Sequence, residues 1–264
     1  MGFCRALVIS PPTLDMVVFG GRFKLRVGGP GLYGGLAFKM MGCDVGLVGP
    51  VGYETLRTTW VEGKLGLHRI GYVSPGEGFL FTLTYANMGS RRFTSFSGRV
   101  QALDPTVVLG TLRDYNPQLV LISPVYGEIS EGLASYICGN VVYCALDLQG
   151  FTRVNYVLRG SRFRVVHVSD DDMDYEEVRG LKASVIYYTR GIRSVSVVLE
   201  GVEHRVDGPT VIVEDPTGAG DVFTAITLYN LYRGFDPVEA ARVAVKLTSR
   251  ILSDIRVTLE ETEG

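Results

Sequence analysis

The chain has 264 residues, and 46% of them are hydrophobic, which is enough to bury one large core in a single α/β domain spanning residues 1–264. The net charge of −2 and the isoelectric point near 6.0 exclude the basic surface that nucleic-acid binding needs, and no apolar run approaches the ~18 residues of a membrane span. Residues 1–10 lack the layout of a signal peptide because Arg5 interrupts a short apolar run, so we expect a cytoplasmic protein.

Apolar, strand-like runs alternate with helical patterns along most of the chain. We predict strands at residues 5–10, 45–48, 119–123, 141–146, 164–168 and 184–189, and helices at residues 31–41, 54–64, 130–138 and 175–181. Such alternation is typical of a mostly parallel sheet with helices on both faces. In sheets of this kind ligands bind beyond the carboxyl ends of the strands, so we expect the functional residues there.

Two segments depart from this alternation. Residues 16–27 hold Gly20 and Gly21 between two β-rich arms, which is typical of a hairpin, and residues 79–96 hold two more strand-like arms. We predict that segments 15–27 and 72–97 form a small sheet that stands off the main one. The alternative is a simple extension of the main sheet.

The most informative run of the chain is 215–223, which reads Asp-Pro-Thr-Gly-Ala-Gly-Asp-Val-Phe between a β-branched run at 210–213 and a helical pattern at 222–233. Gly218, Ala219 and Gly220 are small enough for the backbone to close on a ligand. Their N–H groups fall at the start of a helix, where the unpaired donors and the helix dipole favour an anion. We therefore predict that these three residues form an anion hole for phosphate.

The next residue, Asp221, is a carboxylate beside that expected phosphate. A resting phosphate would repel it, so its presence requires a reason. A carboxylate that accepts the proton of a hydroxyl attacking the phosphate supplies one. The alternative is an ordinary acidic residue in the first turn of a helix.

The run 215–223 resembles the C-terminal signature of the ribokinase (PfkB) family of carbohydrate and nucleoside kinases, Asp-Thr/Pro-Thr-Gly-Ala-Gly-Asp-x-Phe, at every position. The N-terminal signature of that family, a glycine pair that opens a helix and then a strand and turn, resembles Gly28, Gly29 and the run 43–52. The resemblance covers nearly the whole chain because both signatures and the elements between them come in the expected order. It implies a ribokinase-like three-layer sandwich with a mostly parallel central sheet and a small β lid, which is shorter here than in many relatives.

The resemblance also implies an acceptor site beneath the lid. Asp15 follows the first strand, where family members hold sugar hydroxyls with a carboxylate, although an Asp that caps a turn is the alternative. Gly28 and Gly29 allow the backbone to approach the acceptor. Tyr33 stands where ribokinases proper carry an asparagine, and it would either stack on a ring or fill the helix N-terminus. Arg92 on the lid would suit an acidic or phosphorylated acceptor and would not be needed for a neutral polyol.

A second positive group follows the strand predicted at 141–146. Several sugar kinases of the family have an Asp-x-Asn-x-Arg run there, and residues 147–153 show a longer Asp-x-Gln spacing that is more similar to inositol kinases and archaeal relatives. Arg153 would then be a clamp on the γ-phosphate, where charge develops in the transition state. A surface ion pair is the alternative.

The resemblance implies a nucleotide site at the far strands. Thr189 and Gly191 resemble the Thr-x-Gly element beside the ATP phosphates, and Thr217 belongs to the C-terminal signature. The Asn-x-x-Glu motif that organises the Mg²⁺ water shell in the family would fall on Ser169 and Asp172, and both differ from the usual residues. Asp172 can still hold Mg²⁺ through water. The alternative is a set of acidic residues at a helix N-terminus.

The four cysteines have no C-x-x-C spacing and the three histidines form no His-x-x-x-His pair, so we expect no transition-metal site. We favour buried apolar thiols for Cys4, Cys43, Cys138 and Cys144. The preference for Arg over Lys and the scarcity of Asn and Gln are typical of thermophilic proteins, in which intracellular disulfides also occur.

From these features we expect an ATP- and Mg²⁺-dependent kinase that phosphorylates a hydroxyl of a small sugar, an inositol-like polyol or a nucleoside, with Asp221 as general base. The resemblance also leaves room for a monovalent cation. The partner is a small molecule, with no nucleic acid and no membrane, and the chain is a monomer or a homodimer. The alternative is a non-catalytic ligand-binding or regulatory relative of the same fold.

Overall fold

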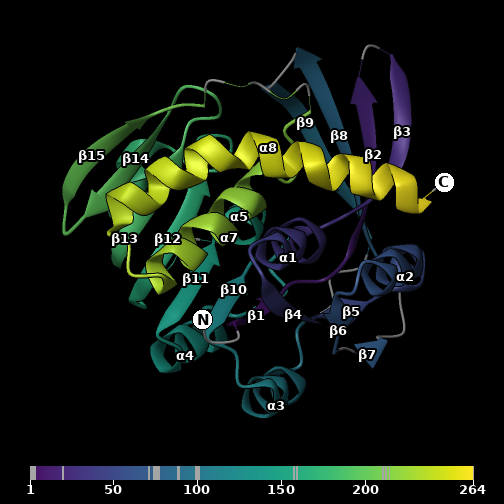
Figure 1. Cartoon of the computed structure of the whole chain (residues 1–264), viewed down its shortest axis with the longest axis horizontal. Helices are drawn as coiled ribbons and strands as arrows, with labels where there is room; N and C mark the ends of the chain where they lie inside the picture. The colour runs from purple at the N-terminus through teal and green to yellow at the C-terminus, as the bar shows by residue number, and fades with distance from the viewer. Residues whose placement is uncertain are drawn as a thin grey trace.

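A computed structural model of the chain (Figure 1) describes residues 4–19, 21–70, 72–73, 78–87, 90–98, 102–156, 158, 160–209, 211, 213 and 215–263. Of residues 19, 72–73, 84–87, 90–96 and 263 it describes only the backbone. Within these ranges no helix is long and apolar enough to cross a membrane.

The described residues form a nine-stranded sheet in the order β15-β14-β13-β12-β11-β10-β1-β4-β6. The pairs β13–β14 and β14–β15 are antiparallel, and all other neighbours are parallel. The strands are β1 (Cys4–Ile9), β4 (Cys43–Val48), β6 (His68–Arg69), β10 (Leu119–Ile122), β11 (Tyr143–Asp147), β12 (Phe163–Ser169), β13 (Ala183–Thr189), β14 (Ser194–Leu199) and β15 (Val202–Asp207). The carboxyl ends of β1 and β10–β13 therefore share one edge.

Helices cover both faces of this sheet, as the alternation of the sequence predicts (Figure 1). One face packs under α1, α7 and α8 through a core that includes Leu32, Val222 and Leu252, and the other packs under α3, α4 and α6 through a core that includes Val108, Ile137 and Val178. The helices are α1 (Pro30–Met40), α2 (Leu56–Lys64), α3 (Pro105–Tyr115), α4 (Glu131–Asn140), α5 (Gln149–Thr152), α6 (Tyr175–Val178), α7 (Ala219–Tyr232) and α8 (Pro237–Glu263), with one 3₁₀ turn, η1 (Tyr53–Thr55).

A second sheet stands off the first, and we call it the small sheet. It contains β2 (Thr13–Phe19), β3 (Arg22–Gly28), β8 (Phe79–Asn87) and β9 (Ser90–Ser97) in the order β3-β2-β8-β9, and a further two-stranded sheet pairs β5 (Pro50–Val51) with β7 (Tyr72–Val73). Because side chains alternate along a strand, Phe79, Phe81 and Leu83 of β8 lie on one face, where they pack with Val17 and Val125. This apolar cluster anchors the small sheet to the carboxyl edge of the large one.

The six predicted strands are all present, each within two residues of its predicted bounds. Three features differ from the sequence prediction. The β-branched run at 210–213 forms no strand at Val211 or Val213, and residues 210 and 212 lie outside the described part of the chain. The predicted helix at 54–64 begins as η1 and continues as α2, and the helix predicted at 175–181 stops at Val178.

The expectation of free buried thiols is wrong. Cys4 and Cys43 begin the neighbouring strands β1 and β4 and are opposite each other in register, and they form a disulfide with a Cα–Cα distance of 4.5 Å. Cys138 of α4 bonds to Cys144 of β11. Sequence spacing did not reveal these pairs because strand order, not separation along the chain, brings the first pair together.

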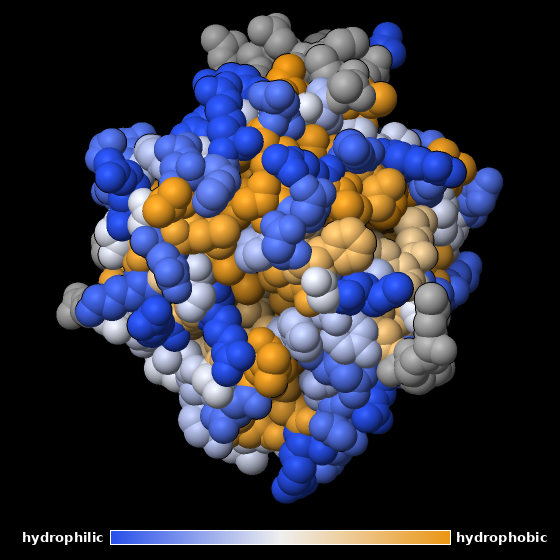
Figure 2. All heavy atoms as spheres, turned by 60° about the vertical axis from the view of Figure 1, so that its left-hand side comes forward, coloured by the Kyte–Doolittle hydropathy of each residue, from blue (hydrophilic) through white to orange (hydrophobic). Residues whose placement is uncertain are grey.

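The face of the molecule turned forward in Figure 2 has apolar side chains in a central depression that hydrophilic residues surround. Exposed apolar side chains also occur on the small sheet, where Phe23 and Leu25 of β3 point away from the buried side that carries Val17.

Candidate active site

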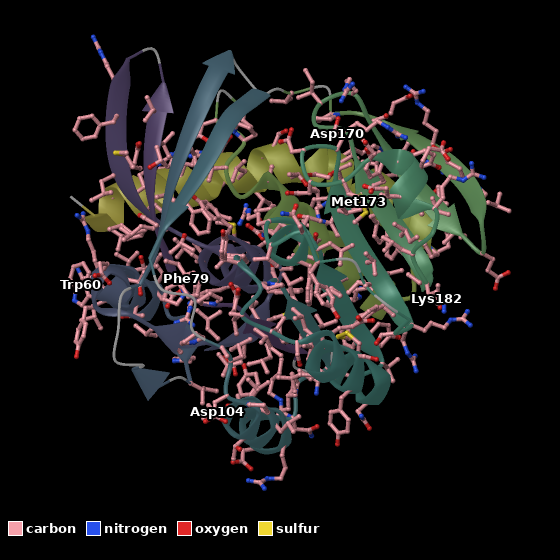
Figure 3. All side chains as sticks on the ribbon, turned by 180° about the vertical axis from the view of Figure 1, so that it is seen from behind. Trp60, Phe79, Asp104, Asp170, Met173 and Lys182 are labelled. Carbon is pink, nitrogen blue, oxygen red and sulfur yellow. A yellow bond between two sulfur atoms is a disulfide. The ribbon has the colours of Figure 1, made fainter. Side chains whose placement is uncertain are left out.

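A cleft of about 550 Å³ runs along the carboxyl edge of the large sheet. Among the residues in which the sequence indicated function, the cleft is lined by Asp15, Gly29, Tyr33, Arg153, Ser169, Asp172, Thr189, Gly191, Thr217, Gly218, Ala219, Gly220 and Asp221. In Figure 3, Asp170 lies at this edge, and Phe79 lies at the base of the small sheet. The structure therefore brings residues from both halves of the chain to one site.

The strand order gives the cleft two ends. Asp15 follows β1, whereas Thr189 ends β13, and three strands separate β1 from β13 in the sheet. Asp221 lies between these two ends, because its carboxylate is close to Ser123, which follows β10. We call the Asp15 side the β1 end and the Thr189 side the β13 end.

Gly218 is the N-cap residue of α7 and has a left-handed backbone with φ of 84°. A Cβ at this position would lie 2.3 Å from the ring of Tyr33, so both conformation and packing require glycine. The N–H of Ala219 donates to the carbonyl of Pro216 at 2.8 Å. Within the described residues, the N–H groups of Gly218 and Gly220 make no such bond, and they are the donors that this helix N-terminus leaves for an anion.

Asp221 lies in the first turn of α7 and is buried, with 8% of its surface exposed. Burial is the largest influence on its pKa and the negative charge of Asp147 is the next, and together they raise the pKa to about 8. Hydrogen bonding by Ser123 and the positive charges of His167 and Arg153 act in the opposite direction. A carboxylate with a raised pKa beside an anion-binding helix end is suited to accept a proton near neutral pH.

Two polar side chains orient the carboxylate of Asp221. The hydroxyl of Ser123 donates to its Oδ1 at 3.3 Å, and Nε2 of Gln149 approaches the same atom at 3.4 Å. Gln149 is in turn held by Arg153, whose Nη2 donates to Oε1 at 2.9 Å. Its long bonds leave Asp221 capacity to accept a shorter hydrogen bond from a ligand.

A buried pair, His167 and Asp147, lies under the glycines. Nδ1 of His167 is 2.8 Å from Oδ2 of Asp147, and Nε2 is 3.2 Å from the hydroxyl of Thr189. Burial lowers the pKa of His167, but the charge and hydrogen bond of Asp147 outweigh it, so the pKa is raised. A Cβ on Gly220 would lie 3.2 Å from this imidazole, so the pair supports the start of α7 from below.

Asp15 is the polar group at the β1 end. It is 5% exposed and accepts a hydrogen bond from the hydroxyl of Thr13 at 2.8 Å. Burial raises its pKa to about 6, against the lowering effects of the Thr13 hydrogen bond and of the charge on Arg26. A Cβ on Gly28 would lie 2.1 Å from Oδ2 of Asp15, so this glycine makes room for the carboxylate.

The remaining predicted residues of the β1 end have different positions. Gly29 has a φ of 101° and packs against the carbonyl of Pro11, where a Cβ would be 3.1 Å away. Tyr33 is 2% exposed, and its ring lies behind Gly218, which favours the interpretation that it fills the helix N-terminus. The side chain of Arg92 lies outside the described part of the structure.

Ser169 and Asp172 lie together at the β13 end. The hydroxyl of Ser169 donates to Oδ2 of Asp172, and both residues line the cleft. In the described ranges, no three or more His, Cys, Asp or Glu side chains cluster as a ready-made metal site. A single carboxylate with waters and substrate phosphates is the usual environment of Mg²⁺, and Asp172 offers one such carboxylate.

Arg153 lies nearer the small sheet than we would expect of a residue that clamps the γ-phosphate. Its Nη1 donates to the carbonyl of Val125 at 2.9 Å, and its guanidinium carbon is 4.9 Å from the centre of the Phe81 ring. Burial raises the pKa of the neighbouring Glu128, while its hydrogen bonds and the Arg153 charge act to lower it. The role of Arg153 as a phosphate clamp stays a prediction.

Sequence reasoning did not identify Ser123, Gln149 and His167 as site residues. Their only shared signal is that each lies at or just after the carboxyl end of a parallel strand. The sequence did not signal the charge network around Asp215 either, because Arg26 and Arg256 lie far from it along the chain.

Comparison with known proteins supports the resemblance. Residues 170–259 match the sequence model of the family described as pfkB family carbohydrate kinase. No curated protein sequence matches the chain.

Solved structures with the same fold extend over nearly the entire chain. A pyrophosphate-dependent kinase in the ribokinase family, complexed with a pyrophosphate analog and myo-inositol, has a TM-score of 0.74 at 18% identity, with 93% of this chain and 94% of that chain covered. The ribokinase from Giardia lamblia has a TM-score of 0.70 at 15% identity, with coverage of 98% and 99%. The nucleoside kinase of Burkholderia thailandensis in complex with inosine has a TM-score of 0.66 at 18% identity, with coverage of 90% and 88%.

These matches confirm the predicted fold class, a mostly parallel α/β sandwich with an added small sheet. The sequence model confirms the family resemblance at residues 170–259, and the solved structures confirm the fold. The chain has the fold of the ribokinase-family kinases, and its residues 170–259 carry the sequence pattern of the pfkB family of carbohydrate kinases.

Proposed function

We propose that this protein is a kinase that transfers the γ-phosphate of ATP to a hydroxyl group of a small sugar, polyol or nucleoside. One observation carries the proposal. Asp221, with a raised pKa, lies in the first turn of the same helix whose N-terminal residues Gly218 and Gly220 line the cleft. A base and an anion-binding helix end so close together suit an alcohol that attacks a phosphoryl group.

In this mechanism the acceptor hydroxyl binds between Asp15 and Asp221 and donates its proton to Oδ2 of Asp221, because Oδ1 is held by Ser123. The N–H groups of Gly218 and Gly220 stabilise the charge on the transferred phosphoryl group. Mg²⁺, when bound near Asp172, would neutralise charge on the donor phosphates. The small sheet, acting as a lid, keeps water from competing with the acceptor.

The lining of the β13 end favours a nucleotide as donor. Beyond Thr189 the cleft continues along apolar side chains from three segments, namely Ile192, Val195, Pro209, Val211, Val213, Val245 and Leu252. A purine base can bury its faces against such side chains, whereas pyrophosphate has no apolar part. We therefore assign ATP as the donor, although two of the similar structures are pyrophosphate-dependent kinases.

The β1 end combines one carboxylate with an apolar wall. Asp15 can accept hydrogen bonds from two hydroxyls, and Phe81 and Leu83, which share its face of the small sheet, line the same end of the cleft together with Val125. A sugar, an inositol-like polyol or a nucleoside each presents a pair of neighbouring hydroxyls to such a carboxylate. Among the similar structures, one has bound myo-inositol and another has bound inosine.

The alternative function is a ligand-binding or regulatory relative without catalysis. The replacement of the usual metal-site residues by Ser169 and Asp172 is the observation that favours it. The burial and raised pKa of Asp221 argue against the non-catalytic alternative. A binding protein gains nothing from a buried carboxylate whose ionised form is destabilised by its surroundings.

The test is a coupled assay of ADP release with Mg²⁺ and a panel of sugars, inositols and nucleosides, run in parallel with pyrophosphate as donor and phosphate as product. We expect acceptor-dependent release of ADP with at least one acceptor class. The same panel in a thermal-shift screen identifies compounds that bind, whether or not they are phosphorylated. Stabilisation by an acceptor without transfer from either donor would favour the non-catalytic alternative, and transfer from pyrophosphate alone would overturn the assignment of the donor.

A further inference from the structure

Arg256, on α8, holds the loop that leads into the glycines. Its Nη1 is 3.1 Å from Oδ2 of Asp215, and its Nη2 donates to the carbonyl of Asp215 at 2.7 Å and to the carbonyl of Thr217 at 2.9 Å. One guanidinium thus contacts three oxygen atoms of two loop residues. Arg256 itself does not line the cleft.

The carboxylate of Asp215 is fully engaged in this loop. Its Oδ1 accepts hydrogen bonds from the N–H of Thr217 at 2.9 Å and from the Thr217 hydroxyl at 2.6 Å. Its Oδ2 pairs with Arg256 and also with Arg26 of β3. Burial alone would raise the pKa of Asp215, but the charges of Arg256 and Arg26 outweigh it, so the pKa is lowered. Asp215 is therefore an anion held between two fixed cations.

These contacts set the orientation of the peptide groups that follow. In a trans peptide the C=O and the next N–H point in opposite directions. Because Arg256 holds the carbonyl of Thr217, the N–H of Gly218 points away from Arg256, and Gly218 lines the cleft. The ring of Tyr33 and the hydrogen bond from Ala219 to Pro216 restrict the same loop further. The anion-binding donors are thus fixed before any ligand arrives.

Two carbonyls and a carboxylate on one loop are the kind of oxygen set that binds a hard cation. A monovalent cation that activates the enzyme by ordering this loop would need the same atoms. In the described structure the guanidinium occupies all three, so the residues present do not fit such an ion. A planar guanidinium with several fixed donors can satisfy these oxygens permanently, and it is charged at every working pH.

We propose that Arg256 takes the place of a monovalent cation in this protein: it is a positioning residue that orders the phosphate-binding loop, and phosphoryl transfer requires neither K⁺ nor Na⁺. The proposal rests on the proposed kinase function for its catalytic part. Its structural part, the occupation of the oxygen set by Arg256, can be tested without turnover.

The first experiment uses the unchanged protein, so that it does not depend on the folding of any variant. ADP release and the melting temperature are measured in K⁺, in Na⁺ and in tetramethylammonium at equal ionic strength. We expect both quantities to be the same in the three salts, within about twofold for the rate, because general screening depends on ionic strength and not on the ion. A rate or a melting temperature that rises specifically with K⁺ or Na⁺ would overturn the proposal.

The second experiment compares Arg256→Ala and Arg256→Lys with Arg250→Ala, a control at an exposed position of the same helix. In tetramethylammonium we expect Arg256→Ala to lower turnover by ~100-fold, the scale of a misplaced catalytic geometry, with Arg250→Ala unchanged. K⁺ or millimolar methylguanidinium should restore most of the turnover of Arg256→Ala, and Arg256→Lys should retain more than Arg256→Ala. Unchanged turnover of Arg256→Ala without added cations would contradict the proposal.

A readout independent of catalysis comes from the same variants. Arg256→Ala exposes the three oxygens, so K⁺ should raise its melting temperature more than tetramethylammonium does, whereas the unchanged protein and Arg250→Ala should show no such difference. If no acceptor gives ADP release, the kinase proposal fails while this measurement still decides the role of Arg256. If K⁺ does not raise the melting temperature of Arg256→Ala more than tetramethylammonium does, the inference is overturned even for an active kinase.

Discussion

The two ends of the cleft are built in different ways. At the glycines, a short continuous stretch of sequence supplies the proposed anion-binding donors, the proposed base Asp221 and the anion Asp215. The β1 end draws on segments far apart in the sequence: Asp15 from β2, Phe81 from β8 and Arg153 after β11. The first site takes its residues from one stretch of sequence, which Arg256 of α8 and Tyr33 of α1 hold in place, and the second depends on how the small sheet packs against the large one.

In the proposed mechanism, this difference means that the glycine loop serves the chemistry and the β1 end determines which acceptor binds. The glycine loop is fixed by Arg256, Tyr33 and its own turn, so it can serve phosphoryl transfer to any acceptor. In the proposed mechanism the β1 end contacts the acceptor with side chains on strands, where we expect substitutions to alter recognition without disturbing the loop. Variants at the two ends should therefore have different kinetic signatures.

Substitution of the base should have the largest effect. We expect Asp221→Asn to keep the fold and ATP affinity and to lower turnover by at least ~100-fold, because the amide cannot accept the hydroxyl proton. Steady-state ADP release and calorimetric ATP binding measure the two quantities. Asp254→Asn, at an exposed position of α8, is the matched control. Near-normal turnover in Asp221→Asn would remove this residue from the mechanism.

Substitution at the β1 end should change recognition more than transfer. Asp15→Asn conserves volume but replaces one accepting oxygen by a donor, so we expect the acceptor KM to rise by ~10–100-fold while the ATP KM stays within about twofold. Kinetics with each substrate varied in turn give both values. An equal effect on both KM values would mean that Asp15 acts on the whole cleft and that the two ends are not independent.

The same contrast explains what the sequence could predict. The run 215–223 predicts a role for Asp221 and its glycines because a local motif requires local residue types, and that role stays a prediction. The periodic patterns predicted the strands whose carboxyl ends line the cleft. Arg256 and His167 could not be found, since their roles come from α8 and β12 packing against the loop rather than from neighbouring residues. Tyr33 was placed on the correct helix, but whether it faced the ligand or the core depended on the packing around Gly218.

If Asp221 is the proton acceptor, its pKa should appear in the pH dependence of kcat/KM. Burial and the charge of Asp147 raise the pKa of Asp221 to about 8, and catalysis needs its deprotonated form. We therefore expect kcat/KM to increase with pH, by about tenfold per unit, and to level off above pH 8. His167 and Arg153 oppose the shift.

A profile that is flat between pH 6 and 9 would show that another step limits the rate or that Asp221 is ionised throughout. Measurement with acceptors of different affinity separates these cases, because a slow acceptor makes chemistry limit the rate. The same profile for Asp15→Asn should level off at the same pH as the unchanged protein, since the β1 end does not carry the base.

Changes at the opposite edge of the sheet, where the two disulfides lie, should have the smallest effect on activity. Cys4 and Cys43 begin their strands at the amino edge, and Cys144 lies near the start of β11, so both disulfides are remote from the site. We expect complete reduction to lower the free energy of unfolding by about 2–4 kcal/mol for each bond, because the unfolded chain gains freedom, and to leave kcat and KM unchanged. Chemical denaturation with and without reductant measures the first quantity, and mass spectrometry of alkylated thiols confirms the reduction.

Cys4→Ser and Cys138→Ser separate the two bonds. The first substitution should lower the free energy of unfolding more, because its bond closes 39 residues rather than 6. Loss of activity at unchanged stability would contradict this picture, since it would couple the amino edge directly to the cleft.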